Sequence, residues 1–361
     1  MEINEIALAL SMTCNVVPGD WNRLDGTPSE IWDLLQRDDG LAHLGRHLGH
    51  AVGPVDWAGF EEQRARVARC NARVASRWDA AYPWLLRQVA SPPPVLFTRG
   101  NTALLQERSV AVVGTRAPSS AGVAFTIRLA RAIASQGVVV VSGLARGIDT
   151  AAHRGALEAP EGATVAVLGT GVDIAYPPEN EGLMRRVIEN GCIVSEQWCG
   201  MIASRFVFPR RNRIISGISE GVVVVEGRAK SGALITARWA LEQGREVGAV
   251  PAFPGDFRSA GPNRLLKEGA FVVEDASDVF ANLPRLRIRS AQPETTHDAA
   301  PSALDGETRR VYDLVARDVD ADDVARASGI EVARVQEILA RLEIDGLVVR
   351  GDSGRFARAN R

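Results

Sequence analysis

The chain has 361 residues, of which 46% are hydrophobic and 24% are charged, as in a globular protein of about two or three domains. Its formal net charge of −2 excludes a protein that coats nucleic acid indiscriminately, so any binding to a phosphate polymer requires a local basic patch. No apolar run is long enough to span a membrane, and no basic segment precedes the short apolar stretch near the N-terminus. We therefore expect a cytoplasmic protein. The cysteines show no zinc-binding spacing and are expected to be reduced thiols; they are Cys14, Cys70, Cys192 and Cys199.

Residues 1–80 are predicted to form a small helical domain rich in tryptophan. The expected helices are Ile3–Cys14, Pro28–Leu35 and Trp57–Ala75. His43 and His47 have the spacing of one helix face, but the acidic partner of a zinc-binding H-E-x-x-H helix is absent from this stretch. We expect no metal site there.

Residues 81–284 are predicted to form an extended Rossmann-like domain. The prolines after Ser91 impose extended chain, and Val95–Phe97 is predicted as the first edge strand. From Ser109 onward, apolar strands alternate with amphipathic helices, which indicates a mostly parallel sheet covered on both faces. The expected strands are Val110–Val113, Val138–Val141, Thr164–Leu168, Cys192–Ser195, Val222–Val225, Val247–Val250 and Phe271–Val273.

The first strand of this domain ends in a turn that is suited to anions. Gly114, Thr115 and Arg116 follow the apolar run, and Ser119 opens an amphipathic helix. Backbone N–H groups and the positive end of a helix favour anions at such a turn. The alternative is that Gly114 only permits a tight turn and that Arg116 is a solvated surface charge.

Two later turns have a similar pattern. Ser142–His153 joins a strand to a helix, with Asp149 as the expected N-cap and Arg146 facing the same end of the sheet. The stretch from Val225 to Thr236 is the third such turn. Together, the three turns predict a crevice that receives phosphate groups.

A dinucleotide cofactor does not fit this pattern. The first turn lacks the second and third glycines of G-x-G-x-x-G, and Tyr176-Pro177-Pro178 delays the helix after the near match at Gly169–Gly171. We expect neither a nicotinamide nor a flavin cofactor. His153 has no nucleophile and orienting group assigned to it, so a structural role is favoured and no catalytic residue is proposed.

The strongest basic stretch of the chain runs from Arg205 to Arg213. Its four arginines with two interleaved phenylalanines are typical of surfaces where arginines hold phosphates and an aromatic ring stacks on a base. The pattern favours single-stranded nucleic acid. The alternative is that Phe206 and Phe208 belong to the core and that the arginines cap or pair at a helix start.

Several motifs of this domain resemble the DNA-processing protein A family (DprA, also called Smf). They are VGTR at Val113–Arg116, SGLARGIDTAAHRGAL at Ser142–Leu157, TVAVLGTGVDIAYPPEN at Thr164–Asn180, FPRRNRIISG at Phe208–Gly217, SGALITA at Ser231–Ala237 and GPNRLLKEGA at Gly261–Ala270. The resemblance implies an extended Rossmann-fold protein that binds single-stranded DNA, dimerises and helps to load the RecA recombinase during natural transformation. It implies no enzyme activity.

The resemblance also assigns site residues. Arg116, Arg205 and Phe208 match the DNA-contacting positions of the family, although Arg205 stands where lysine is frequent. Further candidates in the same pocket are Gly114, Thr115, Arg146, Arg211, Asn212 and Arg213. The family's dimer interface falls on Leu265, Leu266 and Phe271, for which a plain core role is equally expected.

The C-terminal part of the chain is predicted as a linker, residues 285–303, followed by a winged-helix domain, residues 304–361. The expected helices are Glu307–Ala316, Ala321–Ala327 and Glu331–Leu342, followed by a hairpin around Gly351–Gly354. Because the charges of this domain are nearly balanced, contact with duplex DNA and contact with a protein are both left open.

Two functions of other classes compete with DNA binding. A nucleotide-hydrolysing enzyme of the lysine-decarboxylase-like type would carry a catalytic glutamate in P-G-G-x-G-T-x-x-E, and no glutamate follows Gly227 in the first helical turn here. A nucleotide-sensing Rossmann module would bind mononucleotides more tightly than oligonucleotides.

Overall fold

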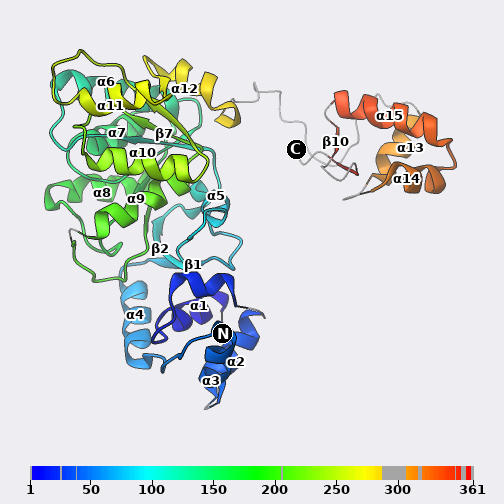
Figure 1. The fold of residues 1–361 in the computed structure, drawn as a ribbon, viewed down its shortest axis with the longest axis horizontal. Coiled ribbons are helices and arrows are strands. Elements are labelled where there is room, and N and C mark those ends of the chain that lie inside the picture. Colours follow the sequence, from blue (N-terminus) through cyan, green and yellow to red (C-terminus); the bar gives the residue numbers. More distant parts are fainter. Residues whose placement is uncertain are drawn as a thin grey trace. The chain divides into compact units, whose positions relative to one another are not determined.

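The computed structural model describes residues 2–24, 27–37, 39–204, 206–286, 306–315, 319–345, 347–350 and 355–358. The chain divides into two compact units, Met1–Ile288 and Arg289–Arg361 (Figure 1). None of the described helices is long and apolar enough to cross a membrane.

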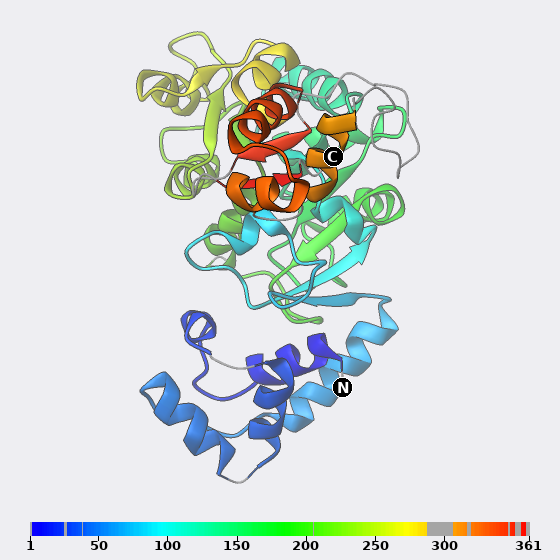
Figure 2. The same ribbon diagram turned by 90° about the vertical axis from the view of Figure 1, so that its right-hand side faces the viewer.

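Four helices open the first unit and lie together at one end of it (Figures 1 and 2). They are α1 (Ile3–Ser11), α2 (Pro28–Gln36), α3 (Gly40–Leu48) and α4 (Trp57–Arg69). Their buried faces share a core in which the rings of Trp21 and Trp78 lie 4.9 Å apart. The predicted helix Trp57–Ala75 is too long. The chain leaves α4 through the left-handed conformation of Asn71 (φ 52°) and then becomes a strand.

A nine-stranded sheet forms the centre of the unit, in the order β1-β2-β6-β5-β4-β3-β7-β8-β9. The strands are β1 (Arg73–Ser76), β2 (Val95–Gly100), β3 (Ser109–Val113), β4 (Val139–Ser142), β5 (Thr164–Val167), β6 (Cys192–Ser195), β7 (Gly221–Val224), β8 (Glu246–Ala249) and β9 (Phe271–Val272). Only the β1/β2 and β2/β6 pairs of this sheet are antiparallel. The predicted edge strand at Val95–Phe97 is therefore the second strand, because Arg73–Ser76 pairs along its outer side.

Helices cover both faces of the sheet. They are α5 (Trp84–Arg87), α6 (Ser120–Ala134), α7 (Ile148–Leu157), α8 (Glu181–Asn190), α9 (Val207–Gly217), α10 (Gly232–Glu242), α11 (Ala260–Lys267) and α12 (Ala276–Asn282). Alternate residues of β3 point to opposite faces. Val110 and Val112 pack with α6, α7 and α12, whereas Ala111 and Val113 pack with α9 and α10. The predicted doubly covered, mostly parallel sheet is confirmed.

The strand order reverses beside β3. The chain adds β4, β5 and β6 on one side of β3, and then crosses to add β7, β8 and β9 on the other side. In open α/β sheets, ligands bind at the carboxyl ends of the strands that flank such a reversal. The carboxyl ends of β3 and β7 are therefore the expected position of the site.

The second unit contains the predicted winged-helix elements. They are α13 (Gly306–Leu314), α14 (Ala321–Ser328), α15 (Val332–Ile344), β10 (Val348–Arg350) and β11 (Phe356–Arg358). Val311, Val324 and Leu339 are buried in their common core. Most of the predicted linker, as well as the hairpin turn Gly351–Gly354, lies outside the described residues. The boundaries predicted at residues 80, 284 and 303 stay predictions.

Candidate nucleic-acid interface

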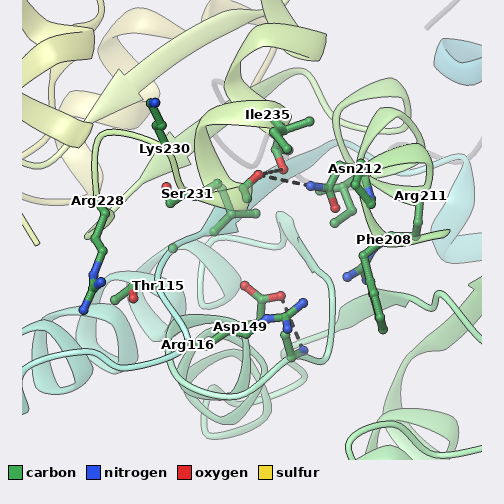
Figure 3. Close-up of a pocket in the computed structure, with 18 of the residues that line it drawn as sticks. Thr115, Arg116, Asp149, Phe208, Arg211, Asn212, Arg228, Lys230, Ser231 and Ile235 are labelled. Carbon is green, nitrogen blue, oxygen red and sulfur yellow. Dashed lines mark hydrogen bonds between the residues drawn. The ribbon is translucent and has the colours of Figure 1, made fainter. Parts of the chain in front are cut away.

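A cavity of about 510 Å³ opens at the carboxyl ends of β3 and β7 (Figure 3). Four cationic side chains line it: Arg116, Arg211, Arg228 and Lys230. Among its described lining residues, Asp149 supplies the one carboxylate. The cavity therefore carries a surplus of positive charge, as a binding site for an anionic ligand requires.

The first turn is closed by the protein itself. The carboxylate of Glu226, at the end of β7, accepts hydrogen bonds from the Ser119 N–H (2.9 Å) and the Ser119 hydroxyl (2.5 Å). The carboxylate also packs on Gly122 in the first turn of α6, where an added Cβ would lie 2.5 Å from its Cδ. The prediction that the start of α6 receives an external anion is wrong, because Glu226 already supplies the negative charge.

The second turn is also filled by protein groups. Gly147 (φ 78°), rather than Asp149, is the N-cap of α7. His153 accepts the Leu144 N–H at Nε2 (3.2 Å), and its Nδ1 lies 2.8 Å from the Thr164 hydroxyl. Burial, with a smaller contribution from the charge of Arg211, lowers the pKa of His153 to about 3. His153 is thus a neutral structural residue, as the sequence favoured.

Asp149 is buried at the floor of the cavity. Burial raises the pKa of this carboxyl, and the positive charge of Arg211 opposes that shift. The Ala145 N–H donates a hydrogen bond to it at 3.4 Å. Asp149 therefore compensates the buried charge of Arg211.

The third turn is open. Helix α10 begins after Ser231, whose side chain makes no capping hydrogen bond. The Ser231 Oγ is buried and has no hydrogen-bond partner among the described residues, although it lines the cavity. Arg228 and Lys230 lie in the same turn. The start of α10 thus presents unsatisfied backbone N–H groups, a hydroxyl and two cationic side chains to a ligand.

Phe208 supplies an aromatic wall. Its ring centroid lies 5.3 Å from that of Tyr176, and the guanidinium carbon of Arg116 lies 5.2 Å from the Phe208 centroid. Gly169 makes this position possible, because an added Cβ would lie 3.0 Å from the Phe208 ring. The half-buried ring is therefore held beside an exposed arginine, an arrangement that suits stacking of a base next to a phosphate contact.

Two arginines of the basic stretch point into the protein. Arg211 is only 4% exposed and donates from Nη1 to the carbonyl oxygens of Gly143 (2.7 Å) and Val167. Its Nε has no partner among the described residues, and burial lowers its pKa to about 10. Arg213 is buried in an ion pair with Glu196 (2.5 Å). These arginines order α9 against the sheet, as the alternative interpretation expected of them, whereas its expectation that both phenylalanines are core residues is wrong, because Phe206 is exposed and Phe208 lines the cavity.

The predicted site residues are only partly brought together. The cavity lining includes Gly114, Thr115, Arg116, Phe208, Arg211 and Asn212. Asn212 donates to the carbonyl of Gly232 (3.1 Å) and so connects α9 to the third turn. Arg146 is exposed, ion-paired with Glu179, and lines a small neighbouring pocket that shares Arg116 and Phe208 with the cavity, whereas Arg213 is not among the lining residues. Arg205 lies outside the described residues.

Sequence reasoning did not single out Tyr176, Arg228, Lys230 or Ser231 as site residues. Arg228 and Lys230 belong to the third predicted turn, whereas Ser231 and Tyr176 also lie in two of the family motifs, SGALITA and TVAVLGTGVDIAYPPEN. The signal for Arg228 and Lys230 is therefore the position of the turn in the fold, and the signal for Ser231 and Tyr176 is a motif to which no residue role was attached.

The predicted dimer residues differ in exposure. Leu265, on the buried face of α11, belongs to the core, whereas Leu266 and Phe271 are half-buried. Phe271 fills the space over Gly248, where an added Cβ would lie 2.5 Å from its ring. Part of this set therefore has a core role.

The fold and the cavity define a Rossmann-like protein with a cationic, aromatic-walled site at its strand-order reversal. The sequence profile of the DNA recombination-mediator protein A family matches residues 73–284, and that of the DprA winged helix domain matches residues 295–354. The chain belongs to this family.

Three relatives illustrate the similarity. A putative DNA processing protein DprA of Mycobacterium tuberculosis is 39% identical over 348 residues, which cover 92% of this chain and 88% of the relative. The X-ray structure of DprA from Streptococcus pneumoniae has a TM-score of 0.64 at 33% identity and covers 78% of this chain and 98% of that one. A Helicobacter pylori DprA structure, described by its single-stranded DNA binding mode, has a TM-score of 0.54 at 29% identity and covers 59% of this chain and 96% of that one.

Proposed function

We propose that this protein binds single-stranded DNA in the cavity at the carboxyl ends of β3 and β7, protects incoming strands and loads RecA onto them in natural transformation. One observation carries the proposal: Phe208 lies beside Arg116 at the wall of a cavity that has four cationic side chains and one carboxylate. A single strand offers phosphates and free base faces together, and this surface can receive both.

The proposed contacts are divided by exposure. Arg116 is exposed and Phe208 half-exposed, so they are available to bind a phosphate and to stack on a base. Gly114, Thr115 and Asn212 would shape the pocket, Arg146 would contact the strand at the rim, and Arg205 would add charge before α9. Arg211 lines the cavity with a buried Nε that has no partner among the described residues, whereas Arg213 supports the site from behind.

The remaining elements of the proposal come from the family. The protein would act in the cytoplasm, without catalysing a reaction, and as a homodimer whose interface includes the surface near Leu266 and Phe271. Glu226, the glutamate of the third turn, accepts two hydrogen bonds from Ser119, which supports a binding protein rather than a nucleotide hydrolase that would use this carboxylate as its base.

The test is a fluorescence anisotropy titration with oligothymidine, matched duplex and AMP. We expect the single strand to bind most tightly, with affinity falling as salt rises. Arg116→Ala should weaken binding to all sequences and lower the salt slope by about 1. Phe208→Ala should cost about 1 to 3 kcal/mol per stacked base. The matched control is Arg238→Ala, since Arg238 is an exposed arginine of α10 outside the cavity lining.

Tighter binding to AMP than to the oligonucleotide, or turnover of AMP, would contradict the proposal in favour of a sensor or an enzyme. RecA loading is tested separately by the lag before RecA hydrolyses ATP on a coated single strand. The lag should shorten with the wild type and stay long with Arg116→Ala.

A further inference from the structure

The loop between β8 and α11 exposes two phenylalanines. Phe253 is 87% exposed and Phe257 is 49% exposed. Because β8 pairs with β7 in parallel, this loop leaves the sheet at the same edge as the turn that carries Arg228 and Lys230. Large aromatic side chains left in water on a loop beside a cationic cavity point to a ligand contact.

Two arginines contact the Phe257 ring. The guanidinium carbon of Arg228 is 4.5 Å from the Phe257 ring centroid, and that of Arg258 is 4.8 Å from it. Arg228 also lines the cavity. The Arg228 side chain therefore contacts both the cavity and the loop that carries Phe257.

The loop is tied to the third turn by backbone hydrogen bonds. The Gly227 N–H donates to the Arg258 carbonyl (2.7 Å), and the Gly261 N–H donates to the Gly227 carbonyl (2.8 Å). Asn263 closes the other end, because it accepts from the Ala252 N–H (3.2 Å) and donates to the Ala252 carbonyl (2.8 Å). Hydrogen bonds near both ends of the loop thus hold the backbone that carries the two phenylalanines.

The local charge suits a phosphate chain. Asp256 is the acidic residue of the loop, and it is paired with Arg258 at 3.1 Å. Arg228 and Lys230 add positive charge beside the rings. Figure 3 shows Arg228 and Phe208 on opposite sides of the cavity, so Phe257, which contacts the Arg228 guanidinium, lies next to the side of the cavity that faces away from Phe208.

We propose that Phe253 and Phe257 form a second base-stacking platform, which binds the nucleotides of a single strand that continue past Arg228 after leaving the cavity. This inference rests on the proposed function and specifies the substrate: a strand long enough to reach both Phe208 and Phe257. A strand that fills only the cavity would not use the second platform.

The test compares oligothymidines near the two limits of a single-strand site, about 4 and about 16 nucleotides. The double variant Phe253→Ala/Phe257→Ala should weaken binding to the long strand by about fivefold or more per lost stack and leave the short strand unchanged. Phe253→Leu/Phe257→Leu keeps apolar surface but removes the flat ring, and should behave like the alanine variant. Leu241→Ala, which removes an exposed apolar side chain from α10, is the matched control and should change neither affinity.

Phe208→Ala separates this inference from the proposed function, since it should weaken the short and the long strand alike. Equal affinities of the wild type and the double variant for the long strand would overturn the second platform while leaving the cavity site intact. Full rescue by the leucine pair, or loss of dimer in light scattering without loss of long-strand binding, would overturn it in favour of contact with a second copy. Failure of the wild type to bind either strand would overturn both.

Discussion

The first and third turns look alike in the sequence but differ in what fills them. Each leaves a β-strand through a glycine and a basic residue and enters a helix through a serine. Ser119 caps α6 and is bound by Glu226, whereas the Ser231 hydroxyl has no partner among the described residues. A carboxylate that follows the neighbouring strand β7 closes one anion site, whereas no described carboxylate caps the start of α10, which leaves that site open to a ligand.

The second turn extends this comparison, because the buried neutral histidine that closes it makes the stability of the fold depend on pH. The pKa of His153 is lowered to about 3, whereas an unfolded histidine has a pKa near 6.5. As the pH falls below about 6.5, this histidine becomes protonated in the unfolded chain, whereas the buried ring of the folded protein stays neutral. The contribution of His153 to the free energy of unfolding is therefore fully present above that pH. It falls by at most about 1.4 kcal/mol per pH unit as the pH drops toward 3.

Urea unfolding between pH 7 and about pH 4.5 measures this loss, and the range is chosen to stay above most carboxyl titrations. His153→Gln should flatten the dependence, so parallel curves for variant and wild type would contradict the assignment. An NMR titration of the ring provides a second check, since His153 should stay neutral throughout.

Removing the charge from the closed first turn should cost stability rather than DNA affinity. Glu226→Gln keeps the shape but weakens the charge-assisted bonds to Ser119, and we expect a loss of about 1 to 2 kcal/mol in the free energy of unfolding. Urea denaturation measures the loss. If the variant kept its stability and bound single strands more tightly, the first turn would be a phosphate site, and the proposed difference between the closed first turn and the open third turn would be wrong.

The open third turn should respond in the opposite way. Lys230→Ala removes an exposed cation from the cavity lining, so the salt slope of single-strand binding should fall by about 1. Stability should stay within about 0.5 kcal/mol. Lys267→Ala, on α11 and outside the lining, is the matched control. A slope unchanged by Lys230→Ala would remove this turn from the interface.

The sheet was largely predictable, because its central strands are continuous apolar runs that only a doubly covered strand explains. Cys192–Ser195 was predicted to the residue. Strand β1 is not predicted, because Arg73–Ser76 has only two apolar residues and follows α4 closely. The predicted helix Trp57–Ala75 therefore extends over most of the strand.

The site was predictable where residues are close in the chain and not where they meet across the fold. Arg116 and Phe208 followed from local patterns and family resemblance. The role of Glu226 depends on a side chain that reaches Ser119 across 107 positions of the sequence. Arg213 is buried because it forms an ion pair with Glu196. The run of arginines alone does not show which of them point into the protein and which point into solvent.

Strand β1 has a practical consequence for shortened forms of this protein. It is the outermost strand, and its backbone hydrogen bonds cover one side of β2. A truncated form that started after Ser76 would leave β2 with a bare edge, ready to pair with a strand of another molecule. Trimming that removes the N-terminal helices should therefore stop before Arg73 if the shortened protein is to resist aggregation.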